Sequence, residues 1–80
     1  MARLEIGKHL ATDTRVCGGR LIFRGTRILV ADALELLAAG YAADEVAHQY
    51  GEKVSAAAVR EAVRLTTRGV VREVTVRPAA

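Results

Sequence analysis

The sequence has few residues suited to cross-linking or metal binding: one cysteine and two histidines among 80 residues. Cys17 has no second cysteine to pair with, so a disulfide within the chain is excluded. His9 and His48 are isolated, without the spacing of metal ligands, and nothing marks a base that would activate Cys17. The four acidic residues within residues 28–50 are explained by helix starts and exposed faces. We therefore expect no catalytic residue, no metal, no cofactor and no enzymatic activity.

Long apolar runs are also missing. No segment approaches the ~20 consecutive apolar residues that a membrane-spanning helix needs. The first residues lack the apolar core of a signal peptide. With only one thiol, the composition indicates a soluble protein of the reducing cytoplasm.

Hydrophobic residues are nevertheless abundant, at 51% of the chain, and most of them are alanine, valine and leucine. A chain of this size buries only about 60% of the surface that its unfolded form exposes. Apolar surface should therefore remain for a partner or a second copy, and we expect a homodimer. The candidate interface residues lie in the two terminal segments: Leu4, Ile6, Val70, Val74 and Val76.

Charge is distributed unevenly around a net value of +3. Residues 1–27 carry six basic side chains against two acidic ones, and residues 51–80 carry six against three. Residues 28–50 carry four acidic side chains and no Lys or Arg. Two basic flanks around an acidic middle could attract a polyanion, or they could complement each other within a dimer.

The segment from Gly19 to Ile28 is the centre of the predicted fold. Its apolar residues 21–23 suit an extended strand bounded by turn residues. Gly25 can adopt a positive φ and reverse the chain, and the Thr26 hydroxyl can accept a hydrogen bond near the next helix start. The segment is either a structural connection between strand and helix or a loop that contacts a ligand.

Three helices are predicted after this turn, each ended by a glycine. Apolar spacing indicates helices over residues 30–39 and 43–50, ended by Gly40 and Gly51. Ser55 is a plausible N-cap for a third helix that runs to residue 67 or 68 and ends at Gly69. The β-branched run over residues 70–76 reads as a strand, as does the alternation over residues 3–6.

These elements predict one domain over residues 1–80 of a mainly α class. A β arm and turn occupy residues 1–29, a three-helix helix-turn-helix unit residues 30–68, and a C-terminal strand and tail residues 69–80. In such a unit the second helix braces the third.

Arginines recur along one side of the predicted third helix. Arg60 and Arg64 are separated by one turn, as phosphate contact or major-groove readout would require. Together with Lys53 they are candidate DNA-binding residues, and Arg24 and Arg27 form a second candidate patch at the turn. The alternative is a solvated helix face without a ligand.

The chain resembles the DUF433 family, which is grouped with VapB-type antitoxins. The residues that carry the resemblance are Asp13, Gly18-Gly19, Phe23-Arg24-Gly25-Thr26-Arg27-Ile28 with Val30, Leu34, Leu36-Leu37-Ala38-Ala39-Gly40, Asp44-Glu45-Val46 and Tyr50. Prolines of the pattern are replaced by Thr14, Leu21, Leu29 and Gly51. Ala42 stands where a serine usually caps the second helix, a loss of about 1 kcal/mol.

The resemblance implies a homeodomain-like fold with an N-terminal β arm. It also implies an antitoxin of a type II toxin-antitoxin pair, which neutralises a PIN-like ribonuclease toxin; such antitoxins often bind their own operator DNA as well. The alternative is a stand-alone helix-turn-helix transcriptional regulator, and a structural dimer without either partner is a third reading.

Overall fold

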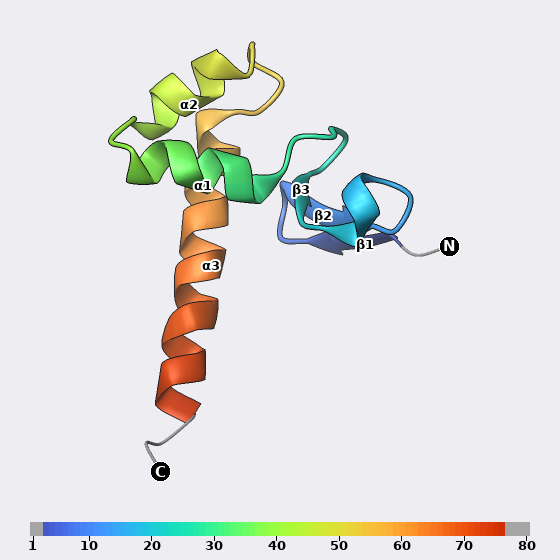
Figure 1. Ribbon diagram of the computed structural model, residues 1–80, viewed down its shortest axis with the longest axis vertical. Coiled ribbons are helices and arrows are strands. Elements are labelled where there is room, and N and C mark those ends of the chain that lie inside the picture. Colours follow the sequence, from blue (N-terminus) through green and yellow to red (C-terminus); the bar gives the residue numbers. More distant parts are fainter. Residues whose placement is uncertain (1–2, 77–80) are drawn as a thin grey trace.

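The structure is a computed structural model that describes the backbone of residues 3–76 and the side chains of residues 3–68. Its elements are β1 (Arg3–Ile6), β2 (Leu10–Asp13), the 3-10 turn η1 (Cys17–Gly19), β3 (Ile22–Phe23), α1 (Val30–Ala38), α2 (Ala43–Gln49) and α3 (Ala56–Val76). The sheet lies beside the helices, and the C-terminal part of α3 extends away from the other elements (Figure 1).

The three strands form one antiparallel sheet in the order β1-β2-β3. Ile6 lies opposite Leu10 across the first pair of strands, and Leu10 lies opposite Phe23 across the second. The predicted strand over residues 3–6 is confirmed. Its partner β2 was not predicted, and it turns the expected arm into a small sheet.

The Gly25 turn has the predicted geometry. Gly25 adopts a φ of 79°, which a residue with a Cβ would rarely adopt. The Thr26 hydroxyl donates to the Phe23 carbonyl at 2.8 Å and accepts from the Ile28 amide at 3.0 Å. One side chain thus fixes both ends of the turn that leads from β3 to α1.

The bounds of α1 and α2 agree with those predicted from the apolar spacing to within one residue at each end. Gly40 and Gly51 follow them with φ values of 108° and 63°, as helix-terminating glycines do. Ala42 offers no side-chain acceptor to α2, as predicted. The Glu45 carboxylate instead accepts from the Ala42 amide at 2.8 Å, so one of the exposed N–H groups at this end is satisfied.

Helix α3 begins as predicted and ends much later. The Ser55 hydroxyl accepts from the Ala58 amide at 3.0 Å, as an N-cap should. The helix then passes through Gly69 to Val76, so the predicted stop and the predicted strand over residues 70–76 are both wrong. A glycine inside a helix costs only about 1 kcal/mol. A helix also satisfies its own backbone groups, whereas a strand would need a neighbour.

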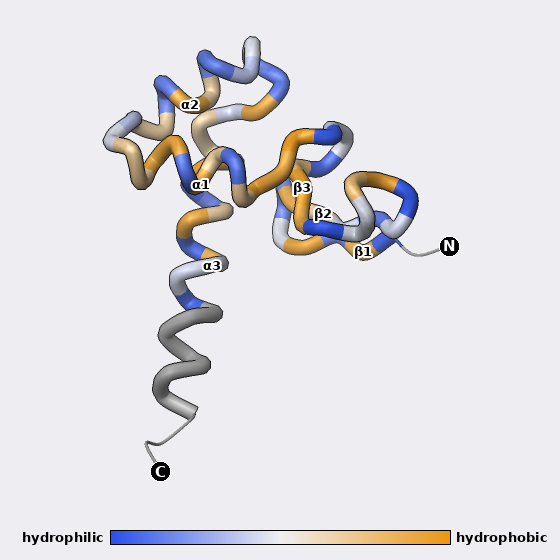
Figure 2. Tube along the Cα trace, viewed as in Figure 1, coloured by the Kyte–Doolittle hydropathy of each residue, from blue (hydrophilic) through white to orange (hydrophobic). Residues whose placement is uncertain are grey.

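The core lies where the sheet meets the three helices. Its largest fully buried side chains are Phe23, Leu10, Val30, Val46, Val54 and Val59. They come from the sheet, from all three helices and from the segment before α3. Apolar stretches are visible along the chain trace in the sheet and in each helix (Figure 2). The structure is therefore three helices with a three-stranded sheet, more mixed than the mainly α class that the sequence predicted.

Candidate functional site

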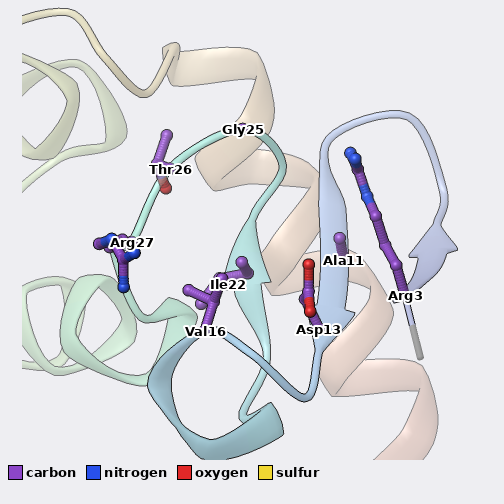
Figure 3. A pocket seen from close by; sticks show the side chains of 8 residues that line it. All are labelled: Arg3, Ala11, Asp13, Val16, Ile22, Gly25, Thr26 and Arg27. Carbon is purple, nitrogen blue, oxygen red and sulfur yellow. The ribbon is translucent and has the colours of Figure 1, made fainter. Parts of the chain in front are cut away.

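A cavity of about 250 Å³ lies between the sheet and the Gly25 turn. Arg3 and Arg27 stand on opposite sides of it, with Ile22 and Val16 between them (Figure 3). Asp13 also lines it, with only 8% of its surface exposed. The cavity therefore combines two cationic side chains, one carboxylate and an apolar floor.

Asp13, the last residue of β2, is hydrogen-bonded to Arg15 in the turn that follows the strand. Its Oδ1 accepts from the Arg15 amide at 2.9 Å and from Arg15 Nε at 3.3 Å. These bonds from Arg15, the side-chain bond first, hold the pKa of the Asp13 carboxyl below its usual value. Asp13 thus fixes the turn that follows β2 and remains an anion, which does not suit it to proton transfer near neutral pH.

A second carboxylate, that of Glu61, joins α3 to the turn between β1 and β2. Its Oε2 accepts from the Lys8 amide at 3.0 Å, and its Oε1 accepts from the His9 amide at 2.8 Å. The same Oε1 lies 2.8 Å from His9 Nδ1. Glu61 is 8% exposed, so a helix side chain satisfies the backbone of a distant hairpin turn inside the fold.

The electrostatics of Glu61 follow from this geometry. The hydrogen bond from the Lys8 amide is the largest influence, the bonds from His9 add to it, and together they outweigh the opposing effect of burial. The pKa of the Glu61 carboxyl is therefore lowered, and the carboxylate form is the one that the fold stabilises. Glu61 was not among the residues predicted from the sequence, because its partners are backbone amides more than 50 residues away.

The candidate DNA-binding residues on α3 are exposed, as the proposed role requires. Arg60 and Arg64 are both exposed, while Val59 and Ala62 are buried beside them. Arg60 Nη2 lies 3.3 Å from Asp44 Oδ1, and both side chains are more than half exposed. An exposed pair of this kind contributes at most about 1 kcal/mol, so Arg60 remains available to another anion.

The structure divides the other candidate DNA-binding residues between two cavities. Arg27 lines the cavity beside Asp13, whereas Arg24 and Lys53 line a different cavity of about 210 Å³. Lys8, which was not among the candidates, joins them there. The two arginines of the predicted turn patch therefore line different cavities, while Lys8, Arg24 and Lys53, which are far apart in the sequence, line the same one.

The homodimer and its interface residues stay predictions, but the strand pairing expected between the two terminal segments is wrong. Ile6 packs against the core, and Leu4 is 61% exposed on the edge strand β1. Val70, Val74 and Val76 belong to α3, so they cannot pair as a strand with β1. The side chains of these three valines lie outside the part of the chain that the structure describes.

Two of the residues considered for catalysis, Cys17 and His9, contact groups elsewhere in the fold. Cys17 Sγ lies 3.4 Å from the Arg27 carbonyl, and His9 contacts Glu61. Among residues 3–76, no three of the His, Cys, Asp and Glu side chains described form a group that could hold a metal ion. No helix in the described part of the chain is long and apolar enough to cross a membrane.

A family profile described as "Protein of unknown function (DUF433)" matches residues 11–65, more than half of the sequence. The chain belongs to the DUF433 family. The match begins in β2 and ends within α3, so it takes in the Gly25 turn, the three helix starts and Glu61. No curated protein and no solved structure matches this DUF433 chain.

The candidate DNA-binding residues all lie within the segment that matches the DUF433 profile. Arg24, Arg27, Lys53, Arg60 and Arg64 all fall inside residues 11–65. Lys8 and His9 precede it, although the fold joins them to it through Glu61. One feature of the sequence could have indicated this contact. Glu61 is an acidic residue among the buried positions of an amphipathic helix, where a carboxylate needs hydrogen-bond partners.

Proposed function

We propose that this protein is a non-enzymatic, DNA-binding antitoxin of the VapB type. The observation that carries the proposal is the two-sided character of α3. Its buried side packs on α1 and α2, and its other side exposes Arg60 and Arg64 at one-turn spacing. A helix braced in this way and facing solvent with arginines suits the major groove of DNA.

The order of the helices supports a helix-turn-helix reading of residues 30–68. Helix α2 contacts α3 and precedes it after a short turn, and α1 contacts both. In a helix-turn-helix protein the second helix of the motif lies in the groove, and its N-terminal residues meet the bases. Arg60 and Arg64 occupy the corresponding part of α3. A homodimer would present two such helices at a fixed separation.

Replacing both arginines tests the DNA half of the proposal. We expect Arg60→Ala with Arg64→Ala to weaken binding to the DNA upstream of the gene. If both contact phosphates, the salt dependence of the binding constant should fall by about 1.8 log units per log unit of salt. Fluorescence anisotropy over a series of salt concentrations measures this slope.

The matched control keeps the charge and changes the shape. Arg60→Lys with Arg64→Lys should retain the wild-type slope, because a lysine neutralises a phosphate as a point charge. It should lose preference for the upstream DNA over an unrelated duplex if the arginines also read bases. A wild-type protein without salt-dependent DNA binding would contradict this half of the proposal.

The toxin half rests on the resemblance to VapB-type antitoxins. The protein would neutralise a PIN-like ribonuclease by covering its acidic, metal-binding active site. Co-expression with a PIN-like protein encoded beside it tests this, with a tag on one partner only. The two should purify together, and the ribonuclease activity should be suppressed in the complex. Separate elution and undiminished activity, with DNA binding retained, would favour a stand-alone regulator.

A further inference from the structure

A basic cleft separates the hairpin turn from the start of α3. One wall carries Lys8, His9 and Arg24, and the other carries Glu52, Lys53 and Ser55. Its volume of about 210 Å³ is several times the roughly 30 Å³ that one water molecule occupies in the liquid. The space can therefore admit a ligand group larger than water.

The cationic side chains come from distant parts of the sequence and converge only in the fold. Lys8 lies in the hairpin turn, Arg24 in the turn after β3, and Lys53 just before α3. The Arg24 amide donates to the His9 carbonyl at 2.7 Å, and Glu61 binds the amides of Lys8 and His9. The backbone that carries the first wall is thus fixed to the sheet and to α3.

The charges of the cleft do not cancel. Three cationic side chains line it against the single carboxylate of Glu52, which is 78% exposed and lies 3.9 Å from His48 Nδ1. Arg24 also lies 3.4 Å from Glu5, in a pair whose side chains are about half exposed. Such a pair is weak in water and leaves the arginine free to turn to a stronger anion. Positive charges placed together around a concave surface favour the binding of an anionic ligand.

We propose that this cleft binds a phosphate of the DNA backbone through Lys8 and Lys53, with Arg24 at its rim. The proposal rests on the proposed DNA-binding function and extends it, because phosphate contacts position a protein on the duplex while base contacts specify the sequence. The cleft adjoins the N-terminal end of α3, where a recognition helix meets the bases. A phosphate held there would set the position of Arg60 and Arg64 along the groove.

Single substitutions at the two lysines test the cleft. Lys8→Ala and Lys53→Ala should each lower the salt slope by about 0.9, to the same extent on upstream DNA and on an unrelated duplex. The ratio of wild-type to variant affinity should accordingly shrink roughly threefold between about 50 mM and about 200 mM salt. Lys8→Arg and Lys53→Arg should keep the wild-type slope. Both side chains are exposed, so an unchanged thermal midpoint should show that folding is intact.

Arg20→Ala is the control for the loss of one positive charge, because Arg20 is exposed but lines another cavity. It should leave the slope unchanged. If the wild type binds DNA and both lysine variants keep its slope, the phosphate cleft is refuted and the α3 proposal stands. If slopes fall equally for the lysine variants and for Arg20→Ala, the effect is one of net charge and the cleft is again refuted. If the wild type shows no salt-dependent binding, the DNA function itself fails, and the cleft proposal falls with it.

Discussion

Glu61→Gln should destabilise the fold by about 1–3 kcal/mol, the range for leaving a buried hydrogen-bond donor without its acceptor. The carboxylate serves three donors, the amides of Lys8 and His9 and the Nδ1 of His9. A glutamine has the same shape, but its one oxygen cannot face Lys8 and His9 at once. Thermal unfolding should show a midpoint lower by roughly 4–8 °C for each kcal/mol lost in a domain of this size.

Glu35→Gln is the matched control, because Glu35 is exposed on α1 and the substitution is the same. It should change the free energy of unfolding by less than about 0.5 kcal/mol. A midpoint for Glu61→Gln that equals that of Glu35→Gln would show that Glu61 does not hold the hairpin turn to α3.

Glu61 should also make stability depend on pH. Because its pKa is lowered in the folded state, its contribution is complete above the ordinary value of 4.5 and is lost as pH falls through the folded value. Asp13 acts in the same direction, but it is present in both proteins and cancels in the comparison. The gap in unfolding free energy between wild type and Glu61→Gln should therefore narrow below about pH 4.5.

Gly7→Ala should be strongly destabilising, because two effects coincide at this position. Gly7 has a φ of 63°, and a Cβ there would lie 2.9 Å from Glu61 Cδ and closer still to its carboxylate oxygen. Left-handed backbone costs a residue with a Cβ about 1–2 kcal/mol, and the clash would also displace the Glu61 carboxylate from the hairpin turn. We expect a total loss of about 2–4 kcal/mol in chemical denaturation.

Gly51→Ala separates the two effects. Gly51 has the same φ of 63°, but a Cβ added to it would meet nothing within 4 Å. It should lose only the backbone contribution of about 1–2 kcal/mol. Equal losses for Gly7→Ala and Gly51→Ala would mean that the close approach of Gly7 to Glu61 contributes nothing to stability.

Local sequence signals predicted the elements that local interactions determine. The Gly25 turn, the Ser55 cap and the glycines after α1 and α2 depend on neighbours within a few residues, and all are as expected. The strand prediction for residues 70–76 failed because β-branched residues indicate a preference for strands but do not show whether a neighbouring strand is present to pair with. Within residues 3–76 no strand lies beside this segment, and it continues α3 (Figure 1).

For the candidate site too, only the features that depend on nearby residues could be predicted from the sequence. Exposure of Arg60 and Arg64 followed from the helical period, because Val59 and Ala62 mark the buried side. The cleft that joins Lys8 to Lys53 depends on the hairpin and on the Glu61 bonds, which link residues more than 50 positions apart. No spacing rule in the sequence connects such residues.

Chemical-shift mapping tests the DNA-binding surface most directly. A ¹⁵N-labelled sample would be titrated with a duplex from upstream of the gene, and amide shifts followed for residues 3–68. We expect the largest changes over residues 53–68 and at Lys8, with small changes in α1. If the amide shifts of residues 53–68 stay unchanged at saturating DNA, this would contradict the proposal that the start and exposed side of α3 form the DNA-binding surface.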